Sequence, residues 1–310
     1  MPFFLAMTQG SEHAQEAFDA GKVIIGHVSN TAHEHALFVL PTVFGIDFSV
    51  TKHVFMLWLV AAIIFVTVTA LVRGYVRQTH RVPTGPMNVL EVGVEFIRDT
   101  VISPSIGHDW VDAWTPLILT FFVFILGANV IGLIPIFDVL GLINHYFIHA
   151  GEGSFIDRLV HGSSTATGNF NVTAGLAVIT FFAIIVAGTR AHGFIRHALN
   201  LVPKGLPLPV TIFLVPIEIL GMLVKPFALT MRLAANMTGG HIAILAILSF
   251  VFIFSSMLNS AGAGIGVGLA FSVPLAAAIS GLEIIVVLVQ AYVFTLLSAV
   301  FIGMAIDSHH

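Results

Sequence analysis

The sequence contains no cysteine, so it offers neither a disulfide framework nor a thiolate metal site. Charged residues are also scarce. They make up 9% of the 310 residues, whereas a soluble domain carries roughly a quarter. Hydrophobic residues make up 57% of the chain, and the mean hydropathy is +1.00. A water-soluble core cannot bury so much apolar surface, so the composition excludes an ordinary soluble enzyme and indicates a membrane protein.

Several functional signatures are missing as well. No basic cluster with interleaved aromatic residues suggests nucleic-acid binding, and no internal repeat is evident. The chain has no P-loop, no GxSxG nucleophile motif and no HExxH zinc motif. The first residues lack a positively charged region, so we expect no cleaved signal peptide. Seven histidines are expected to be solvated loop residues rather than metal ligands: His13, His27, His33, His35, His145, His149 and His161.

Five long apolar runs dominate what is present, and each reaches the roughly 20 residues that a helix needs to cross hydrocarbon. They lie at about residues 54–72, 114–137, 171–189, 210–257 and 261–306. None alternates between polar and apolar residues as barrel strands do, so the sequence predicts an all-α membrane protein. The mixed stretch at about 86–106 predicts an additional amphipathic helix at the membrane interface.

Basic residues in the loops predict the orientation of the chain. They follow the first and third runs, at Arg73, Arg77, Arg81, Arg190, Arg196 and Lys204. By the positive-inside rule these loops are cytoplasmic, which places the N-terminus outside and the C-terminus in the cytoplasm. We therefore predict an extracytoplasmic segment at 1–52, an integral membrane domain at 53–310 and an outer loop at about 138–170.

The last two runs are too long for one perpendicular crossing. About 48 residues at 1.5 Å each make a helix of roughly 72 Å, more than twice a hydrocarbon core of about 30 Å. We expect the fourth run to tilt steeply or break, with Pro216 and Pro226 as kink points. The fifth run contains Pro274. We expect the glycine-rich stretch AGAGIGVG at its start to separate two segments of an oblique helical hairpin.

Ionisable side chains at membrane depth are costly, so they are candidate functional residues. Those of the fourth run fall on defined helix faces. Glu218, Lys225 and Arg232 recur every seven residues and share one face, and Asn236 lies one turn beyond Arg232. His241 follows Arg232 by nine residues and lies on the opposite face. One helix thus offers a permanent cation to one neighbour and an imidazole to another.

The fifth run adds a carboxyl group and an amide. Glu283 and Gln290 are seven residues apart and share a face that could meet His241. Carboxylate and imidazole can pass protons near neutral pH, whereas the guanidinium of Arg232 never gives its proton up. The amides of Asn236 and Gln290 would order water or hold helices together. The arrangement predicts a proton path that ends at a barrier.

Less specific explanations apply to some of these residues. We expect Lys225 to snorkel toward the interface rather than to act in the path. Arg232 is too far from both helix ends for that, so we interpret it as functional. His241 and Glu283 would alternatively form a structural hydrogen-bonded pair.

Two stretches resemble the signature helices of subunit a of F-type ATP synthases. They are KPFALTMRLAANMTGGHIAIL at 225–245 and GLEIIVVLVQAYVFTLLSAVFIGMAI at 281–306. Weaker similarity extends to PIEIL around Glu218, ANVIGLIP around Asn129 and NFNVTAGLAV around Asn171. The likeness covers most of the chain.

The resemblance implies a proton-channel stator subunit with two aqueous half-channels, itself not an enzyme and without cofactors. Arg232 matches the essential arginine that faces the rotor ring of c subunits, and Glu218 matches a carboxylate of the half-channel toward the cytoplasm. The residues that match the half-channel open to the outside are Asn236, His241, Glu283 and Gln290. The implied partners are the c-ring, the peripheral-stalk b subunits, other synthase subunits, protons and the lipid bilayer, and the implied location is a bacterial plasma membrane.

Two departures from the family pattern stand out. Some bacterial relatives carry an acid at the position of His241 and a histidine at that of Glu283, so the two groups are exchanged between helices. Gly132 stands where some relatives have an acid, which argues against a proton carrier in the second span.

One alternative of another class is a proton-coupled secondary transporter, which also concentrates charge at mid-membrane. Such a protein normally shows two comparable halves, whereas this chain places its membrane-depth ionisable residues in its last third. Sodium remains open as the coupling ion, because ion choice resides mainly in the rotor ring.

Overall fold

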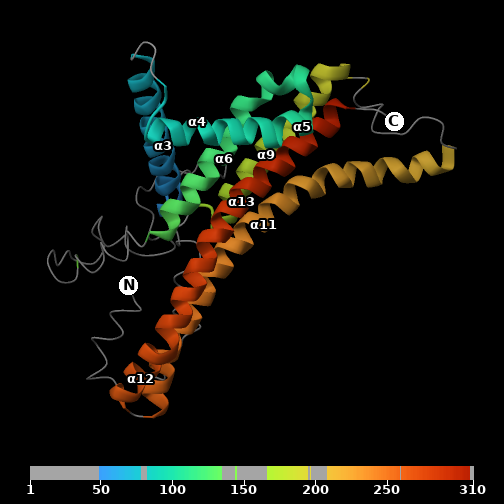
Figure 1. Ribbon diagram of the computed structural model, residues 1–310. Coiled ribbons are helices and arrows are strands. Elements are labelled where there is room, and N and C mark those ends of the chain that lie inside the picture. The colour runs from blue at the N-terminus through green and yellow to red at the C-terminus, as the bar shows by residue number, and fades with distance from the viewer. Residues whose placement is uncertain are drawn as a thin grey trace. The chain divides into compact units, whose positions relative to one another are not determined.

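The computed structural model describes residues 49–77, 82–134, 144, 166–194, 196, 208–258 and 260–307 (Figure 1). Most of the predicted segment 1–52 and of the outer loop lies outside these residues. So do the seven loop histidines, Arg81 and Lys204. In the described part every regular element is a helix, which confirms the all-α prediction.

Among the residues that the structure describes, five helices are long and apolar enough to cross a membrane, as the sequence predicts. They are α3 (Lys52–Val76), α6 (Val111–Leu133), α9 (Phe170–His192), α11 (Leu208–Met257) and the helical run that ends in α13 (Val273–Ile306). The second was predicted to reach residue 137, but α6 ends at Leu133 and the chain bends at Ile134.

The expected break in the fourth run is absent. Helix α11 is continuous over 50 residues and passes through Pro216 and Pro226. A proline removes one helical hydrogen bond, but interrupting the helix inside hydrocarbon would expose several more peptide groups. Continuity is therefore the less costly solution, and the length of α11 has to be accommodated by tilt.

The glycine-rich stretch was expected to separate the two segments of the helical hairpin, but it is helical and belongs to the second segment. The chain turns at about 258–260, and the glycines form helix α12 (Ala261–Val267), which continues into the π-helix η5 (Gly268–Ser272). A Cβ on Gly264 would lie 2.6 Å from the Cβ of Ser255, and one on Gly268 would lie 3.0 Å from Val251. The small residues therefore let two antiparallel helices approach closely.

The interfacial helix exists at the predicted position. It consists of α4 (Pro86–Phe96), the π-helix η2 (Ile97–Ile102) and α5 (Ser103–Ile106). Pro104 follows η2 just as Pro274 follows η5. A proline ring clashes with the carbonyl four residues earlier, and in both places that carbonyl belongs to the widened π turn. The π segments thus absorb a proline without ending the helix.

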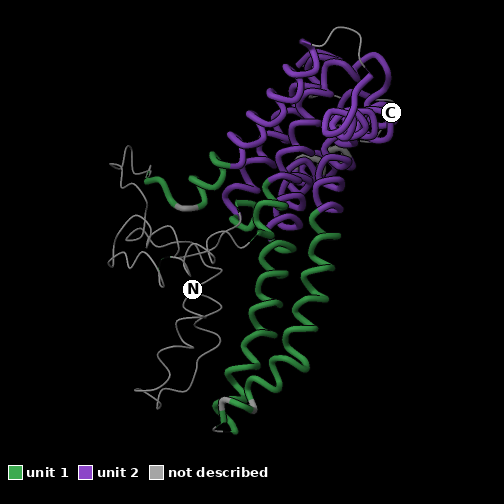
Figure 2. The backbone as a smooth tube through the Cα atoms, turned by 60° about the vertical axis from the view of Figure 1, so that its left-hand side comes forward, with its two compact units in different colours: residues 1–59, 128–169, 235–287 green, residues 60–127, 170–234, 288–310 purple. Residues whose placement is uncertain are grey.

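The chain forms two compact units, coloured in Figure 2. The first consists of residues 1–59, 128–169 and 235–287. In it, the second half of α11 runs beside α12 and the start of α13 (Figure 2). A small apolar cluster around Met56 and Ala166 connects α3 with the turn that precedes α9.

The second unit consists of residues 60–127, 170–234 and 288–310. Its larger apolar cluster joins η2 and α5 to α6, α9 and the end of α13. Gly303 of α13 leaves no room for a Cβ beside the backbone oxygen of Ser105. A second cluster joins α6, α11 and α13, with the rings of Phe121 and Phe294 edge to face at 5.6 Å.

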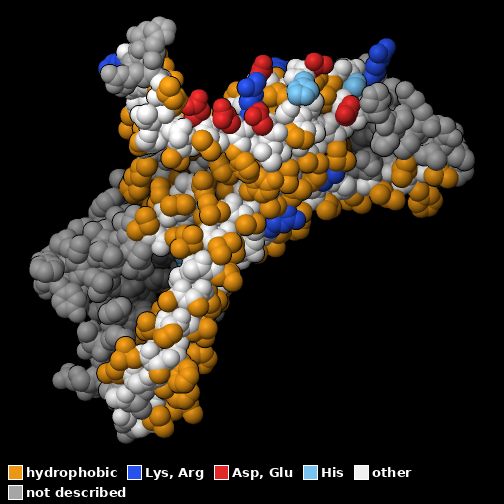
Figure 3. Space-filling view, in the orientation of Figure 1, with side chains coloured by type: hydrophobic (Ala, Val, Ile, Leu, Met, Phe, Trp, Pro, Cys, Tyr) orange, Lys and Arg blue, Asp and Glu red, His pale blue; other side chains and the backbone are white. Residues whose placement is uncertain are grey.

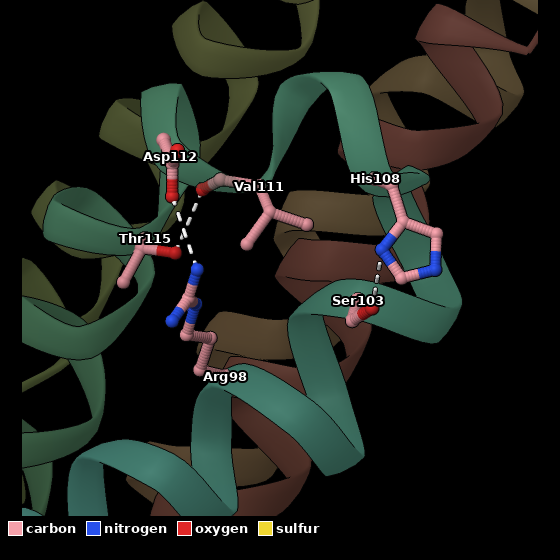
Figure 4. Close-up of polar contacts among 6 residues, drawn as sticks. All are labelled: Arg98, Ser103, His108, Val111, Asp112 and Thr115. Carbon is pink, nitrogen blue, oxygen red and sulfur yellow. Dashed lines mark hydrogen bonds and ion pairs between the residues drawn. The ribbon is translucent and has the colours of Figure 1, made fainter.

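Charged side chains of the second unit gather along one edge, over the interfacial helix and the start of α6 (Figure 3). There Arg98 donates to Asp112 across 3.3 Å, and the side chains of Ser103 and His108 lie 3.5 Å apart (Figure 4). Both contacts are exposed, so they orient the corner between α5 and α6 more than they stabilise it.

The close packing of α12 on α11 predicts opposite effects for two neighbouring glycines. The methyl group of Gly264→Ala would overlap Ser255, so this change should lower the free energy of unfolding by about 1–3 kcal/mol. Thermal unfolding in detergent measures the loss. Gly266→Ala meets nothing within 4 Å and should be neutral or stabilising, because alanine favours a helix. Equal effects of the two changes would contradict this packing.

Candidate functional site

Within the second unit, α11 packs one side against α6 and α13, and another side is exposed. Leu229 and Leu233 are buried at 2% and 1% exposure against Phe121 and Phe294. Arg232 is exposed, although it adjoins Leu233 in sequence. Because each residue turns an α-helix by about 100°, the apolar anchoring of the two leucines directs Arg232 away from the core.

Arg232 makes no hydrogen bond or ion pair with any residue that the structure describes. A guanidinium on a membrane-spanning helix without a counter-charge is costly. Its polar environment is therefore incomplete within the part of the chain that the structure describes.

Lys225, seven residues earlier, has a different environment. Its ammonium lies 5.4 Å from the ring centroid of Phe301 on α13, and the side chain is half-buried. We predicted snorkelling for this residue, and that prediction did not anticipate a defined contact with a neighbouring helix. No acidic partner is found for it among the described residues.

Gln290 belongs to the same unit as Arg232. It is 9% exposed and lies on α13 one turn before Phe294, on the side that packs toward α11. It makes no hydrogen bond with a residue in the described part of the chain. A buried amide at this depth is suited to binding water or an incoming polar group.

In the first unit, the structure brings together the predicted imidazole and carboxyl group. Nδ1 of His241 and Oε1 of Glu283 lie 3.9 Å apart, which is ion-pair distance but too long for a hydrogen bond. Glu283 is 5% exposed and His241 is 27% exposed. A small shift of either side chain would allow a direct bond, and one water molecule would bridge them.

Gly240 makes this approach possible. A Cβ at position 240 would lie 2.6 Å from Oε1 of Glu283, so any larger residue would displace the carboxyl group. Its neighbour Gly239 has nothing within 4 Å of such a Cβ. The two glycines therefore have separate roles, although they are adjacent in sequence.

Two of the predicted site residues contribute less to this geometry. Asn236 is exposed on α11, one turn beyond Arg232 in sequence, and makes no hydrogen bond with the described residues. Glu218 lies within α11, which places it in the same helix as Arg232 and His241. Its predicted role remains a prediction.

Sequence reasoning missed a buried polar group in the first unit. Thr167 donates a 2.6 Å hydrogen bond to Asn129, and the two side chains are at most 1% exposed. Thr238 of α11 donates to the backbone oxygen of Gly168 across 3.2 Å. Thr238 precedes His241 by three residues, so both lie on one side of α11.

A signal for this group was present in the sequence. Asn129 lies in the stretch ANVIGLIP, and Thr167 comes shortly before NFNVTAGLAV. Only the fold brings these polar residues, 38 positions apart, into contact. The described part of the first unit therefore combines a titratable pair with buried hydroxyl and amide groups. This chemistry suits proton transfer more than bond cleavage.

Comparisons with known proteins agree with this chemistry. Residues 54–303 match the model of a family described as ATP synthase A chain. The chain is 41% identical over 295 residues to ATP synthase subunit a 2 of Chlorobium luteolum, a match that covers 92% of this chain and 76% of that protein. It is 40% identical over 263 residues to ATP synthase subunit a of Chloroherpeton thalassium, which covers 84% and 68% respectively. It is 38% identical over 305 residues to ATP synthase subunit a 2 of Prosthecochloris aestuarii, covering 96% and 83%.

The Asn129–Thr167 contact predicts a clear double-mutant pattern. Thr167→Val removes the donor and leaves the buried amide oxygen of Asn129 unsatisfied, so it should cost about 1–3 kcal/mol of unfolding free energy. Thr167→Ser keeps the donor and should cost less. Combining Thr167→Val with Asn129→Leu should recover part of the loss, because no unpaired polar atom remains. Thermal unfolding in lipid nanodiscs measures all three, and strictly additive losses would contradict the contact.

Proposed function

Since the chain belongs to the ATP synthase A chain family, the proton-channel stator subunits of F-type ATP synthase, we propose that Arg232 is the residue that couples its proton path to rotation of a c-ring. The chain is thus a multi-pass subunit of the membrane sector of that complex in a bacterial membrane. In this proposal it catalyses no bond chemistry, and nucleotide chemistry belongs to other subunits.

The exposed, unpaired guanidinium of Arg232 is the observation that carries the proposal. A carboxylate on a rotating partner would supply the counter-charge that the described part of this chain lacks. The fixed positive charge favours the ionised carboxylate as it passes and repels protons that would otherwise leak across. Each proton that crosses 100 mV releases about 2.3 kcal/mol, so such a seal preserves the driving force for rotation.

His241 and Glu283 serve the half-channel open to the outside in this proposal. Their 3.9 Å separation supports proton exchange between imidazole and carboxyl group, directly or through one water molecule. Asn236 and Gln290 order water in the same half-channel. The pair Asn129–Thr167 and the hydroxyl of Thr238 extend its polar lining.

Glu218 serves the half-channel toward the cytoplasm. The orientation rests on the positive-inside rule, with Arg73 and Arg190 at the ends of α3 and α9 on the cytoplasmic side. The N-terminus is then outside and the C-terminus in the cytoplasm. Peripheral-stalk b subunits hold the chain against the turning ring.

Arg232→Ala should abolish proton-driven ATP synthesis, because the passing carboxylate loses its counter-charge and protons leak past it. The complex should still assemble, because Arg232 is exposed and makes no hydrogen bond or ion pair with a residue in the described part of this chain. The measurement is ATP synthesis and passive proton conduction in vesicles that carry the variant complex. Arg73→Ala, which removes an arginine at the end of α3, is the matched control and should retain synthesis. Normal synthesis by Arg232→Ala would refute the proposal.

Adjacent glycines test the His241–Glu283 pair. Gly240→Ala pushes the carboxyl group of Glu283 away from the imidazole and should slow ATP-driven proton pumping on the order of tenfold or more. Gly239→Ala adds a methyl group in open space and should leave pumping close to normal. Pumping in inverted vesicles measures both, with the amount of assembled complex as the normaliser. Equal pumping by the two variants would show that this pair does not limit proton entry.

A further inference from the structure

A second cation lies on the same side of α11 as Arg232. Lys225 precedes it by seven residues, which turns the helix by about 700° and leaves the two side chains only about 20° apart. They are separated by about 10.5 Å along the axis. Both belong to the second unit, and both lie in a helix long and apolar enough to cross the membrane.

The ring of Phe301 holds the ammonium of Lys225 in place. Its centroid lies 5.4 Å from Nζ, within the distance of a cation–π contact. Phe301 itself packs against both apolar clusters of the second unit, so the ring is fixed by several helices. A ring face attracts the cation without neutralising it. Lys225 thus presents its ammonium at a defined position.

Other charged or titratable groups lie on each element that packs in this unit. On α13 within this unit the titratable side chain is Tyr292, and Asp307 follows the helix end. Helix α9 carries Arg190 and His192 in its last turn, where His192 bonds the backbone oxygen of Ile306 at 2.8 Å. Helix α6 carries Asp112, which pairs with Arg98. Helix α11 carries Arg232 and Glu218. Of these, Arg232 is the cation that shares the face of Lys225.

We propose that Lys225, positioned by Phe301, is a second fixed cation of the proton path and sets how readily protons are released to the cytoplasm. This inference rests on the proposed function. Lys225 lies between Arg232 and Glu218 in the sequence of α11, on the side assigned to the cytoplasmic half-channel. There its charge favours the ionised form of a rotor carboxylate and so promotes loss of the proton.

Removing the charge of Lys225 should shift the pH dependence of proton release in the alkaline direction. Without the cation the carboxylate holds its proton more tightly, so release during synthesis requires a higher cytoplasmic pH. For unit charges about 10 Å apart at an effective dielectric constant near 20, the expected alkaline shift is on the order of one pH unit. The outer pH dependence should not change, because proton entry does not involve Lys225.

The experiment measures ATP synthesis by the whole complex in vesicles while the pH on each side is varied separately. Lys225→Met should shift the cytoplasmic-side profile to higher pH by about half to one unit and leave the outer-side profile unchanged. Lys225→Arg keeps the charge and the ring contact and should restore the native profile. Phe301→Leu keeps the charge but frees the ammonium, so it should produce a smaller shift in the same direction.

Phe181→Leu is the control, because it removes a ring of α9 that packs on Phe182 rather than on a cation. It should move neither profile. An unchanged cytoplasmic-side profile for Lys225→Met, equal shifts on both sides, or failure of Lys225→Arg to restore the profile would each overturn the inference. None of these results would affect the proposed function, which fails instead if Arg232→Ala synthesises ATP normally.

Discussion

Hydrocarbon offers no hydrogen bonds to a peptide group and no solvation to a charge, and the architecture of this chain follows from that constraint. It keeps α11 helical through two internal prolines. It also explains the π segments before Pro104 and Pro274, which absorb a proline without opening the helix. At Gly168, where the backbone departs from a helix, the hydroxyl of Thr238 on α11 donates to the backbone oxygen.

The same constraint gives meaning to charges that remain uncompensated. Among the described residues, Arg232 has no partner and Lys225 has only an aromatic ring. A stable membrane protein has no structural reason to keep two such cations on one helix face. In the proposed function, both would face a rotor carboxylate whose negative charge comes and goes as it binds and releases protons. His241 and Glu283, by contrast, lie at ion-pair distance from each other within the chain.

Much of the fold was predictable because membrane helices depend on local composition. Run length and the absence of alternation identified the five crossings, and mixed polarity identified the helix at 86–106. The differences were local. Tilt and breakage were both open for the fourth run, and α11 shows no break; the glycines at 261–268, expected to separate the two segments of the hairpin, are helical themselves. An open peptide group is costly in hydrocarbon, which favours a continuous helix in both places.

By itself the sequence determined the fold class, the crossings and the identity of the ionisable candidates, since these depend on composition and on the helical repeat. Tertiary structure decided which candidates meet. It brought Asn129 to Thr167, placed Glu283 against Gly240 and laid Lys225 over Phe301. These contacts join positions far apart in the chain, and they depend on how closely two helices pack. That distance depends on where small residues and aromatic rings meet in the folded chain, and the sequence pattern alone does not show which of them meet.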